Sequence, residues 1–522
     1  MAYLTGFDRQ QTALIPQCID ELIPEDSLVR IIDVFVDSLP MEKLGFMDEP
    51  TSSDGRPSYH PNDLFKLYVY GYLNRVRTSR LLERECQRNI EMMWLLKGLQ
   101  PCFRTIAGFR SEKSQALRNT FKHFVGSLNK AGLIGGKTVA IDSSKFRAVN
   151  SKKNNFNIAK IKRQLEYIDE KVNQYMKDLD QGDLNEQQEE IIHQKIKKQK
   201  VRKAKYNRLE KQLDASGETQ ISTTDSDARS MILHGSVIEV AFNVQTTVDE
   251  KHKLIVDYEP TNTNDRKALL PTSLRAKEIC KAENLTVLLD KGYFNAEQID
   301  SCTKEGIITY VSPQVIPRSN PVPIPEYYGD KFIYNTKKDT YICPAGHTMR
   351  TNGNWYEKKY KESITKVRHY KTQSCKGCPV RSNCTTNPNN RIIERSQYAD
   401  SVEQNNNRVN NDFPTYQKRQ QIIEHVFGTI KRQWGYDHIL LKGLKKNQGE
   451  FGLIFLIYNF RRLINILKPS LLKRWMRALF SLVLIPRWFR KYSMLKFENH
   501  FFEILLSQIG NFRFWNRSYC TN

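Results

Sequence analysis

The chain has 522 residues, of which 39% are hydrophobic and 26% are charged. It is too long for one domain of ordinary size, and it has enough apolar residues to bury a core, which argues against a wholly disordered chain. Lys plus Arg number 81 against 57 Asp plus Glu, so the formal net charge is +24. This charge argues against an enzyme that steers cationic substrates, and it predicts a polyanionic partner: nucleic acid first, a membrane surface second.

Segments that would cross or target a membrane are not expected. The longest apolar run, Ala478–Pro486, has Arg on both sides and is shorter than the ~18–20 residues that span a bilayer. Met1–Gln10 contains no apolar stretch typical of a signal peptide. Only 10 residues are Cys, and four of them cluster, which favours a reducing cytosol with one metal site over a disulfide-bonded protein.

The sequence pattern changes from helical to mixed helix and strand near Gly135. Residues 1–135 carry apolar residues at helical spacing and are predicted to be helical. Their Arg-rich faces suit either phosphate contacts or simple solvation. After Gly135 and Gly136, strand-like runs follow that alternate with a helix predicted over 276–284, which indicates an α/β core. These runs are Thr138–Asp142, Val237–Thr247, Leu254–Asp257, Leu285–Leu289 and Ile307–Val311.

Two segments interrupt this core. Residues 151–215 give no strand signal; apolar residues from Ile161 to Leu179 step by four and three, and a second charged helix follows the break at Gln181, so an antiparallel helical hairpin is predicted. The Lys-rich stretch Lys195–Lys205 fits either a DNA contact or a solvated face. Residues 312–415 are rich in Pro and Asn and hold the cysteine cluster.

The C-terminal part is the most basic. Residues 416–467 are predicted to be helical, and 468–522 form an aromatic and basic extension without a clear structural prediction. From Tyr416 to the end there are 19 Lys or Arg and 5 acids, a net charge of +14. DNA affinity that falls steeply with salt is therefore expected.

Three acids stand out by their positions. Asp142 and Asp290 each end a predicted strand, where ligands bind in open α/β sheets. Glu424 lies on a predicted helix, and Lys431 follows seven residues later on the same face. Three adjacent carboxylates would repel one another, and a divalent cation such as Mg²⁺ relieves that repulsion. Taken singly, each acid is better explained as an ordinary turn or surface residue, and only the three together, with their order and flanks, make a specific signal.

The flanks of these acids resemble those of bacterial insertion-sequence DDE transposases. Asp142-Ser-Ser-Lys-Phe-Arg resembles the first-acid motif, and Asp290-Lys-Gly-Tyr matches D-x-G-[FY]. The third motif, Y-x2-R-x3-E-x6-K, is met by Glu424 and Lys431, while Arg419 lies one residue further from Glu424 than in that form. The resemblance covers about residues 1–467. It extends to segments that begin at Gly55, Thr105, Thr224, Phe242 and Tyr458.

This resemblance implies an α/β fold with an RNase H-like mixed-sheet core. Asp142, Asp290 and Glu424 would be catalytic and would bind two Mg²⁺ (or Mn²⁺) ions, and water and then a DNA 3′-OH would attack phosphodiesters. Lys431, with Arg419, Tyr416 and Arg432, would bind DNA. Glu450 is a rival third acid that lacks a Lys seven residues later.

The same resemblance implies the partners and the domains. The partners would be double-stranded DNA, as terminal inverted repeats and target, and a second copy in a homodimer; no membrane is involved, and the location would be the cytoplasm, at the nucleoid. The expected domains are a helical DNA-binding domain (1–135), the catalytic core (136–150, 216–311 and 416–467), the hairpin insertion (151–215), the Cys-rich insertion (312–415) and the extension (468–522).

The cysteine cluster predicts a separate, structural metal site. Cys375 and Cys378 form a C-x2-C pair, and Cys343 and Cys384 complete four thiols, a set that suits tetrahedral Zn²⁺. His347 or His369 could replace one thiol. The alternative is four reduced cysteines without metal.

Two other functions remain open from the sequence. One is a DNA-binding derivative of a transposase that has lost catalysis. The other is an RNase H-like nuclease that cuts DNA without strand transfer. Joined DNA products would distinguish a transposase from both.

Overall fold

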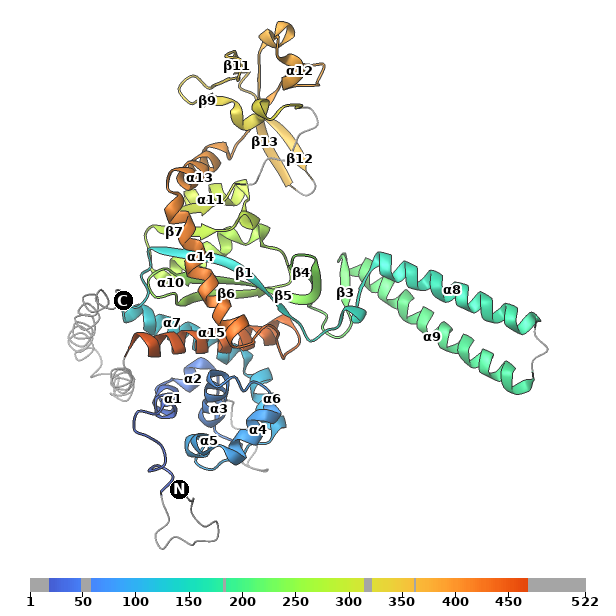
Figure 1. Ribbon diagram of the computed structural model, residues 1–522, viewed down its shortest axis with the longest axis vertical. Coiled ribbons are helices and arrows are strands. Elements are labelled where there is room, and N and C mark those ends of the chain that lie inside the picture. Colours follow the sequence, from blue (N-terminus) through green and yellow to red (C-terminus); the bar gives the residue numbers. More distant parts are fainter. Residues whose placement is uncertain (1–17, 48–57, 182–184, 314–321, 361–362, 468–522) are drawn as a thin grey trace, which may run out of the picture. The chain divides into compact units, whose positions relative to one another are not determined.

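The computed structural model describes residues 18–47, 58–181, 185–313, 322–360 and 363–467 (Figure 1). The chain folds into two compact units. The first contains residues 1–135, 143–263 and 424–522, and the second contains residues 136–142 and 264–423. Each unit is described by itself. The predicted C-terminal extension, 468–522, lies outside the described residues.

The predicted helical character of the N-terminal part is confirmed. Ser27 caps the first helix by accepting from the backbone N–H of Val29, a role for which Ser is well suited because its side chain replaces a missing intrahelical partner. Lys66 is 2% exposed and pairs with Asp33 at 2.6 Å and Asp37 at 2.8 Å, which joins α1 to α3. The helices are α1 (Leu28–Asp37), α2 (Met41–Leu44), α3 (Pro61–Leu73), α4 (Ser79–Arg88), α5 (Ile90–Leu95), α6 (Phe103–Glu112) and α7 (Ser114–Lys130).

The first unit also contains an antiparallel sheet. Strand β5 (Val237–Asp249) pairs with β4 (Arg229–His234) along its first half and with β6 (Ile255–Thr261) along its second half. In the order of the sheet, β5 also lies next to β1 (Thr138–Arg147). The predicted strands over 237–247 and 254–257 are thus confirmed. Burial explains the strand-like sequence pattern that predicted these strands, since ten consecutive residues of β5 are buried.

In the second unit, three strands run parallel. The first residues of β1 pair with β7 (Leu285–Leu289), and β7 pairs with β8 (Ile307–Val311). Helices α10 (Leu269–Cys280) and α11 (Ala296–Lys304) precede β7 and β8. The helix predicted over 276–284 lies earlier, because Lys281 adopts a left-handed φ of +53° and ends the helix.

The cysteine-rich part folds as a second, wholly antiparallel sheet, which the sequence did not predict. Its order is β12-β13-β11-β10-β9, with β14 also paired to β13. Its short strands carry many charged and polar residues, so periodicity alone gives little signal. The strands are β9 (Ile333–Asn335), β10 (Thr340–Ile342), β11 (Thr348–Thr351), β12 (Tyr356–Tyr360), β13 (Ser363–Lys371) and β14 (Ile393–Ser396).

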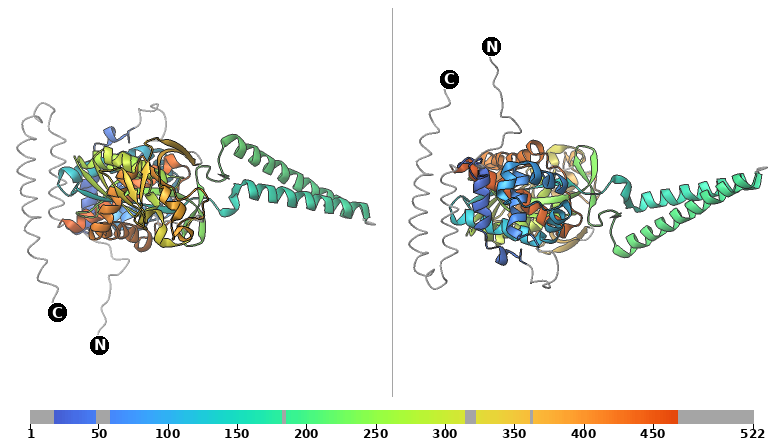
Figure 2. Two further views of the ribbon diagram at one scale, coloured as in Figure 1. Left: turned by 90° about the horizontal axis from the view of Figure 1, so that it is seen from above. Right: turned by 90° about the horizontal axis from the view of Figure 1, so that it is seen from below.

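Two long antiparallel helices occupy the segment predicted as a hairpin. Helix α8 (Ile158–Gln181) and helix α9 (Glu186–Ser216) lie side by side in all three views (Figures 1 and 2). Their base is closed by β2 (Asn155–Asn157) paired with β3 (Gln220–Ser222). Buried contacts near this base involve Phe156, Ile161, Leu209 and Leu213.

The stretch 416–467, predicted as helical, contains an interruption. Helix α13 (Ala399–Asn411) is followed by α14 (Phe413–Phe427), which continues into a π-helical turn, Gly428–Gln433. The chain then leaves the helical path until α15 (Leu444–Ile466), with positive φ values at Gly435 and Gly443. These backbone angles favour glycine and break a helix. Within the described ranges, no helix is both long and apolar enough to span a membrane.

Candidate active site

Two of the predicted acids lie next to each other in the second unit. The register of the parallel strands pairs Ile141 of β1 with Leu289 of β7, and Asp142 and Asp290 are the next residue of each chain segment. Neighbouring strands lie about 4.8 Å apart. Asp290 directly follows β7, but the prediction that a strand ends at Asp142 is wrong, because β1 continues beside β5 to Arg147. Asp142 instead lies inside β1, one residue after its pairing with β7 ends. The two acids are neighbours at the carboxyl end of this parallel pairing, and both are half-buried.

The backbone after β7 fixes the position of Asp290. Its side chain caps a short 3₁₀ turn, Lys291–Tyr293, by accepting from the backbone N–H of Gly292 at 3.4 Å. Tyr293, two residues further, is 1% exposed and anchors the turn in the core. The motif Asp-Lys-Gly-Tyr thus has a local reason: one buried aromatic residue holds the turn that presents the carboxylate.

An arginine from α14 holds the other acid. The Arg419 guanidinium donates to Asp142 Oδ2 at 3.2 Å, and the side chains are 16% and 25% exposed. Tyr416, about one helical turn earlier, is half-buried and lies 6.0 Å from the Phe413 ring. Arg419, which was predicted to bind DNA, therefore forms an ion pair with Asp142, a predicted catalytic acid, in this structure.

The remaining predicted residues belong to the first unit. Glu424 is exposed on α14, and Arg432 is exposed in the π-helical turn. Lys431 points to strand β1 instead: its ammonium group donates to Ser144 Oγ at 2.8 Å and to the Lys145 carbonyl at 2.6 Å.

The Lys431 ammonium group also lies against an aromatic ring and is largely removed from water. Its Nζ lies 4.7 Å from the centre of the Phe146 ring. Burial lowers the pKa of Lys431 from 10.5 to about 8, because a desolvated ammonium group is costly. The side chain thus fastens the π-helical turn to β1, two to three residues after Asp142.

Within the second unit, the structure brings Asp142 and Asp290 together, whereas Glu424 belongs to the first unit. In the described part of the chain, no group of three or more His, Cys, Asp or Glu side chains is positioned to hold a metal ion. The donors are all carboxylates, a set that fits hard divalent ions such as Mg²⁺ or Mn²⁺.

Glu450, the rival candidate for the third acid, makes structural contacts in the protein core. It is fully buried, pairs with Arg77 at 2.8 Å and accepts from the backbone N–H groups of Leu440 and Leu441 at 2.9 and 3.0 Å. Both of its oxygens are therefore used within the core of the first unit. This arrangement argues against Glu450 as a metal ligand.

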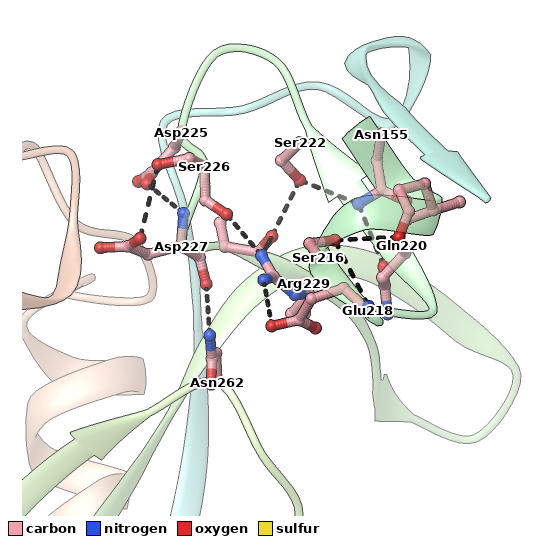
Figure 3. Close-up of polar contacts among 12 residues, drawn as sticks. Asn155, Ser216, Glu218, Gln220, Ser222, Asp225, Ser226, Asp227, Arg229 and Asn262 are labelled. Atoms are coloured by element: carbon pink, nitrogen blue, oxygen red, sulfur yellow. Dashed lines mark hydrogen bonds and ion pairs between the residues drawn. The ribbon is translucent and has the colours of Figure 1, made fainter. Parts of the chain in front are cut away.

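Sequence reasoning gave no role to a second acidic pair, Asp225 and Asp227 (Figure 3). Asp225 Oδ1 accepts from the backbone N–H groups of Asp227 at 3.3 Å and Gly443 at 3.1 Å, and Asp227 Oδ2 accepts from that of Leu444 at 2.8 Å. Both acids therefore cap the start of α15, where unpaired N–H groups favour negative charge. The Thr-Asp-Ser-Asp motif was a visible signal, but its partner is more than 200 residues away.

The four clustered cysteines line one pocket, together with His347. The backbone N–H of His347 donates to Cys343 Sγ at 3.3 Å. Burial raises the pKa of the Cys384 thiol, and the other three cysteines add to that rise. His369, the other predicted substitute ligand, stacks on Tyr356 at 4.5 Å and is not among the residues that line this pocket.

Comparisons with known proteins give matches to two transposase families, each over less than half of the chain. Residues 342–464 match the family described as "Transposase DDE domain", and residues 17–112 match the family described as "Transposase domain (DUF772)". No curated protein matches the chain. A structural match to the cryo-EM structure of a piggyBac transposase synaptic complex with hairpin DNA has 10% identity, covers 93% of this chain and 84% of that chain, and has a TM-score of 0.28. That score is too low to establish a shared fold.

Proposed function

This chain belongs to the insertion-sequence DDE transposases, and we propose that it cleaves the ends of its element and joins them to target DNA by metal-dependent phosphoryl transfer. The observation that carries the proposal is the register of β1 and β7, which makes Asp142 and Asp290 neighbours at one sheet edge. Two carboxylates held by adjacent strands form a rigid base for divalent cations beside a phosphate.

Glu424 is proposed as the third acid. The helix that carries it makes contacts with β1 before and after it: Arg419 with Asp142, and Lys431 with Ser144. Each contact lies within one unit. Glu424 is exposed on α14, which leaves it accessible to an ion.

The protein's own residues divide the remaining work. When bound, two Mg²⁺ or Mn²⁺ ions would activate the attacking oxygen and stabilise the leaving oxygen. Arg419 balances the charge of Asp142 and would be available for a DNA phosphate once other positive charge is present. Lys431 positions the helix through Ser144. Tyr416 and the exposed Arg432 are proposed to contact the DNA backbone near the site.

The wider organisation is proposed on the same basis. The antiparallel strands β4, β5 and β6 and the parallel strands β1, β7 and β8 together would form an RNase H-like core, since β1 contributes to both sets. The helical N-terminal residues would bind the terminal inverted repeats, and a homodimer would hold paired ends in the bacterial cytoplasm.

An in vitro cleavage and joining assay tests the proposal. The substrate is the DNA that flanks this gene, incubated with Mg²⁺ or with EDTA. Asp290→Ala is compared with wild type and with Glu283→Gln, a matched control at the exposed opposite end of β7. Metal-dependent cutting and joining by wild type and Glu283→Gln, but not by Asp290→Ala, is expected.

The other results separate the rival functions. Cutting that survives Asp290→Ala would refute the assigned site. Nicked DNA without joined products would indicate a nuclease, and tight binding of the ends without any cutting would indicate an inactive derivative.

We also propose that Cys343, Cys375, Cys378 and Cys384 bind a structural Zn²⁺ ion. The support is that all four thiols line one pocket and influence one another electrostatically. They are not yet positioned as a metal site in the described residues, so binding would have to draw the thiols together. Their deprotonated sulfurs would provide a closed, tetrahedral, non-catalytic set.

Metal analysis of protein purified without added zinc tests this site. About one zinc per chain is expected in wild type and much less in Cys375→Ser/Cys378→Ser. Cys302→Ser, which changes a buried cysteine elsewhere in the second unit, is the control and should keep its zinc. Wild-type protein without zinc would refute the proposal.

A further inference from the structure

A strongly basic surface lies on helix α9, far along the chain from the predicted acids. Between Ile191 and Leu209 the sequence contains no acidic residue. Seven basic side chains in this stretch are exposed: Lys195, Lys197, Lys198, Lys200, Arg202, Lys205 and Arg208. We call this set the α9 basic stripe. It extends over about 20 Å of helix at 1.5 Å per residue.

The charge of the stripe is not neutralised by neighbouring groups. In the described residues, ion pairs along this stretch are confined to Lys203, which faces α8 and pairs with Asp169 at 2.5 Å. Arg202 donates only to the neutral side chain of Gln199 at 3.1 Å. Helix α8 differs, because its five Lys or Arg are interspersed with five Asp or Glu over its 24 residues. The positive charge is therefore concentrated on one helix of the pair.

The outer surface of α9 is unsuited to self-association. Ile196, Leu209 and Leu213 are buried against α8 and its base. The exposed apolar residues of α9, Ile191 and Val201, lie about 15 Å apart along the helix axis and so do not form a continuous apolar patch. An apolar stripe that could bury a second copy is absent from the described residues of α9. Basic groups outnumber apolar ones on its exposed surface.

We infer that α8 and α9 form a DNA-binding arm, in which the α9 basic stripe contacts the phosphate backbone without regard to sequence. Duplex DNA carries one charge per about 1.7 Å of its axis, so a stripe of about 20 Å meets several phosphates. Lys and Arg on an exposed helix can each reach a phosphate and release a counterion. The choice of DNA as the polyanion rests on the proposed function, while the contact itself does not require the catalytic acids.

Measurement of DNA affinity against salt tests this inference. The full-length chain is titrated with a fluorescent 30-base-pair duplex of arbitrary sequence in EDTA, so that cleavage does not occur. The arm variant carries Lys197→Gln, Lys198→Gln, Lys205→Gln and Arg208→Gln. The matched control removes the same number of charges from α8 by Lys162→Gln, Arg163→Gln, Lys171→Gln and Lys177→Gln.

The arm variant is expected to bind DNA about 10- to 100-fold more weakly at 0.15 M salt. The slope of log affinity against log salt should become shallower by roughly 2 to 4, since each phosphate contact contributes about 0.9. The α8 control should bind within about threefold of wild type. A third variant carries Lys197→Arg, Lys198→Arg and Lys205→Arg. It should bind like wild type, which would show that binding needs the positive charge and not lysine in particular. Far-UV circular dichroism checks that all variants keep their helices.

Three results would overturn the inference. One is an arm variant whose affinity and salt slope equal those of wild type. Another is an equal loss in the α8 control, which would indicate a general effect of net charge. The third is an arm variant that binds DNA as well as wild type does but no longer binds vesicles of anionic lipid, which would identify a membrane surface as the partner. Because EDTA prevents cleavage, each result is independent of whether Asp142 and Asp290 cut DNA.

Discussion

The molecule contains two pairs of aspartates in motifs, and their surroundings differ. Asp142 lies inside β1 and Asp290 directly after β7, and both are half-buried. Asp142 pairs with the Arg419 side chain, and Asp290 accepts from the backbone N–H of Gly292. Asp225 and Asp227 accept from backbone N–H groups at the start of α15. A side-chain partner can move away when an ion arrives, whereas a backbone partner is fixed by its helix. Asp142 is therefore suited to ligand binding, and the pair of Asp225 and Asp227 is suited to stability.

The first prediction sharpens this comparison through activity. Asp142→Asn and Asp290→Asn should each lower the rate of DNA cleavage by at least about 1,000-fold, which corresponds to roughly 4 kcal/mol of barrier. Their melting temperatures should stay close to that of wild type, because neither acid is deeply buried. Gel assays of cleavage with parallel melting curves measure both. A variant that keeps its rate would remove that acid from the site.

The second prediction contrasts the two candidate third acids. Glu450→Ala should destabilise the first unit by about 3–5 kcal/mol, because it leaves the buried Arg77 without its partner. Glu424→Ala, at an exposed position, should change stability by less than about 0.5 kcal/mol and abolish cleavage. Chemical denaturation and cleavage assays on both variants test this. The reverse pattern would make Glu450 the catalytic acid.

The third prediction concerns the second aspartate pair. Asp227→Ala should lower stability by about 1–2 kcal/mol through loss of the α15 cap, with the cleavage rate per folded molecule unchanged. Ser226→Ala is the control, since Ser226 is exposed between the two acids. Native-state hydrogen exchange at the start of α15 should increase only in the Asp227 variant. Loss of cleavage at full stability would instead place Asp227 in the active site.

The smallest predicted effect is a pH dependence at Lys431. Because its pKa falls from 10.5 to about 8 in the folded protein, the unfolded chain binds more protons between these pH values, and stability due to Lys431 rises with pH in that window. The melting temperature of wild type relative to Lys431→Met should therefore increase from pH 7.5 to pH 9.5. The corresponding change in the free energy of unfolding is on the order of 1 kcal/mol. Lys446→Met, which removes an exposed lysine, is the control. A constant difference would contradict the burial of Lys431.

The sequence predicted the elements whose local pattern is strong. The runs Leu285–Leu289 and Ile307–Val311 became β7 and β8 with the same bounds, since short apolar runs rich in β-branched residues favour buried strands. The seam from Ile161 to Leu179 likewise predicted α8. The placement of Asp290 directly after a strand followed from the same patterns, whereas β1 continues past Asp142 to Arg147. The small sheet around the cysteines could not be predicted, because its strands are short and largely polar.

What the sequence determined by itself was the chemistry available: the acids and their flanks, the four thiols and the excess of Lys and Arg. Which acids are neighbours was decided only by tertiary structure, because the β1–β7 register joins residues 148 positions apart. The same holds for Glu450, whose partner Arg77 lies far away in the chain, and for Lys431, whose ammonium group is turned to β1. Side chains acquire these roles through burial and long-range contacts, which local patterns do not encode.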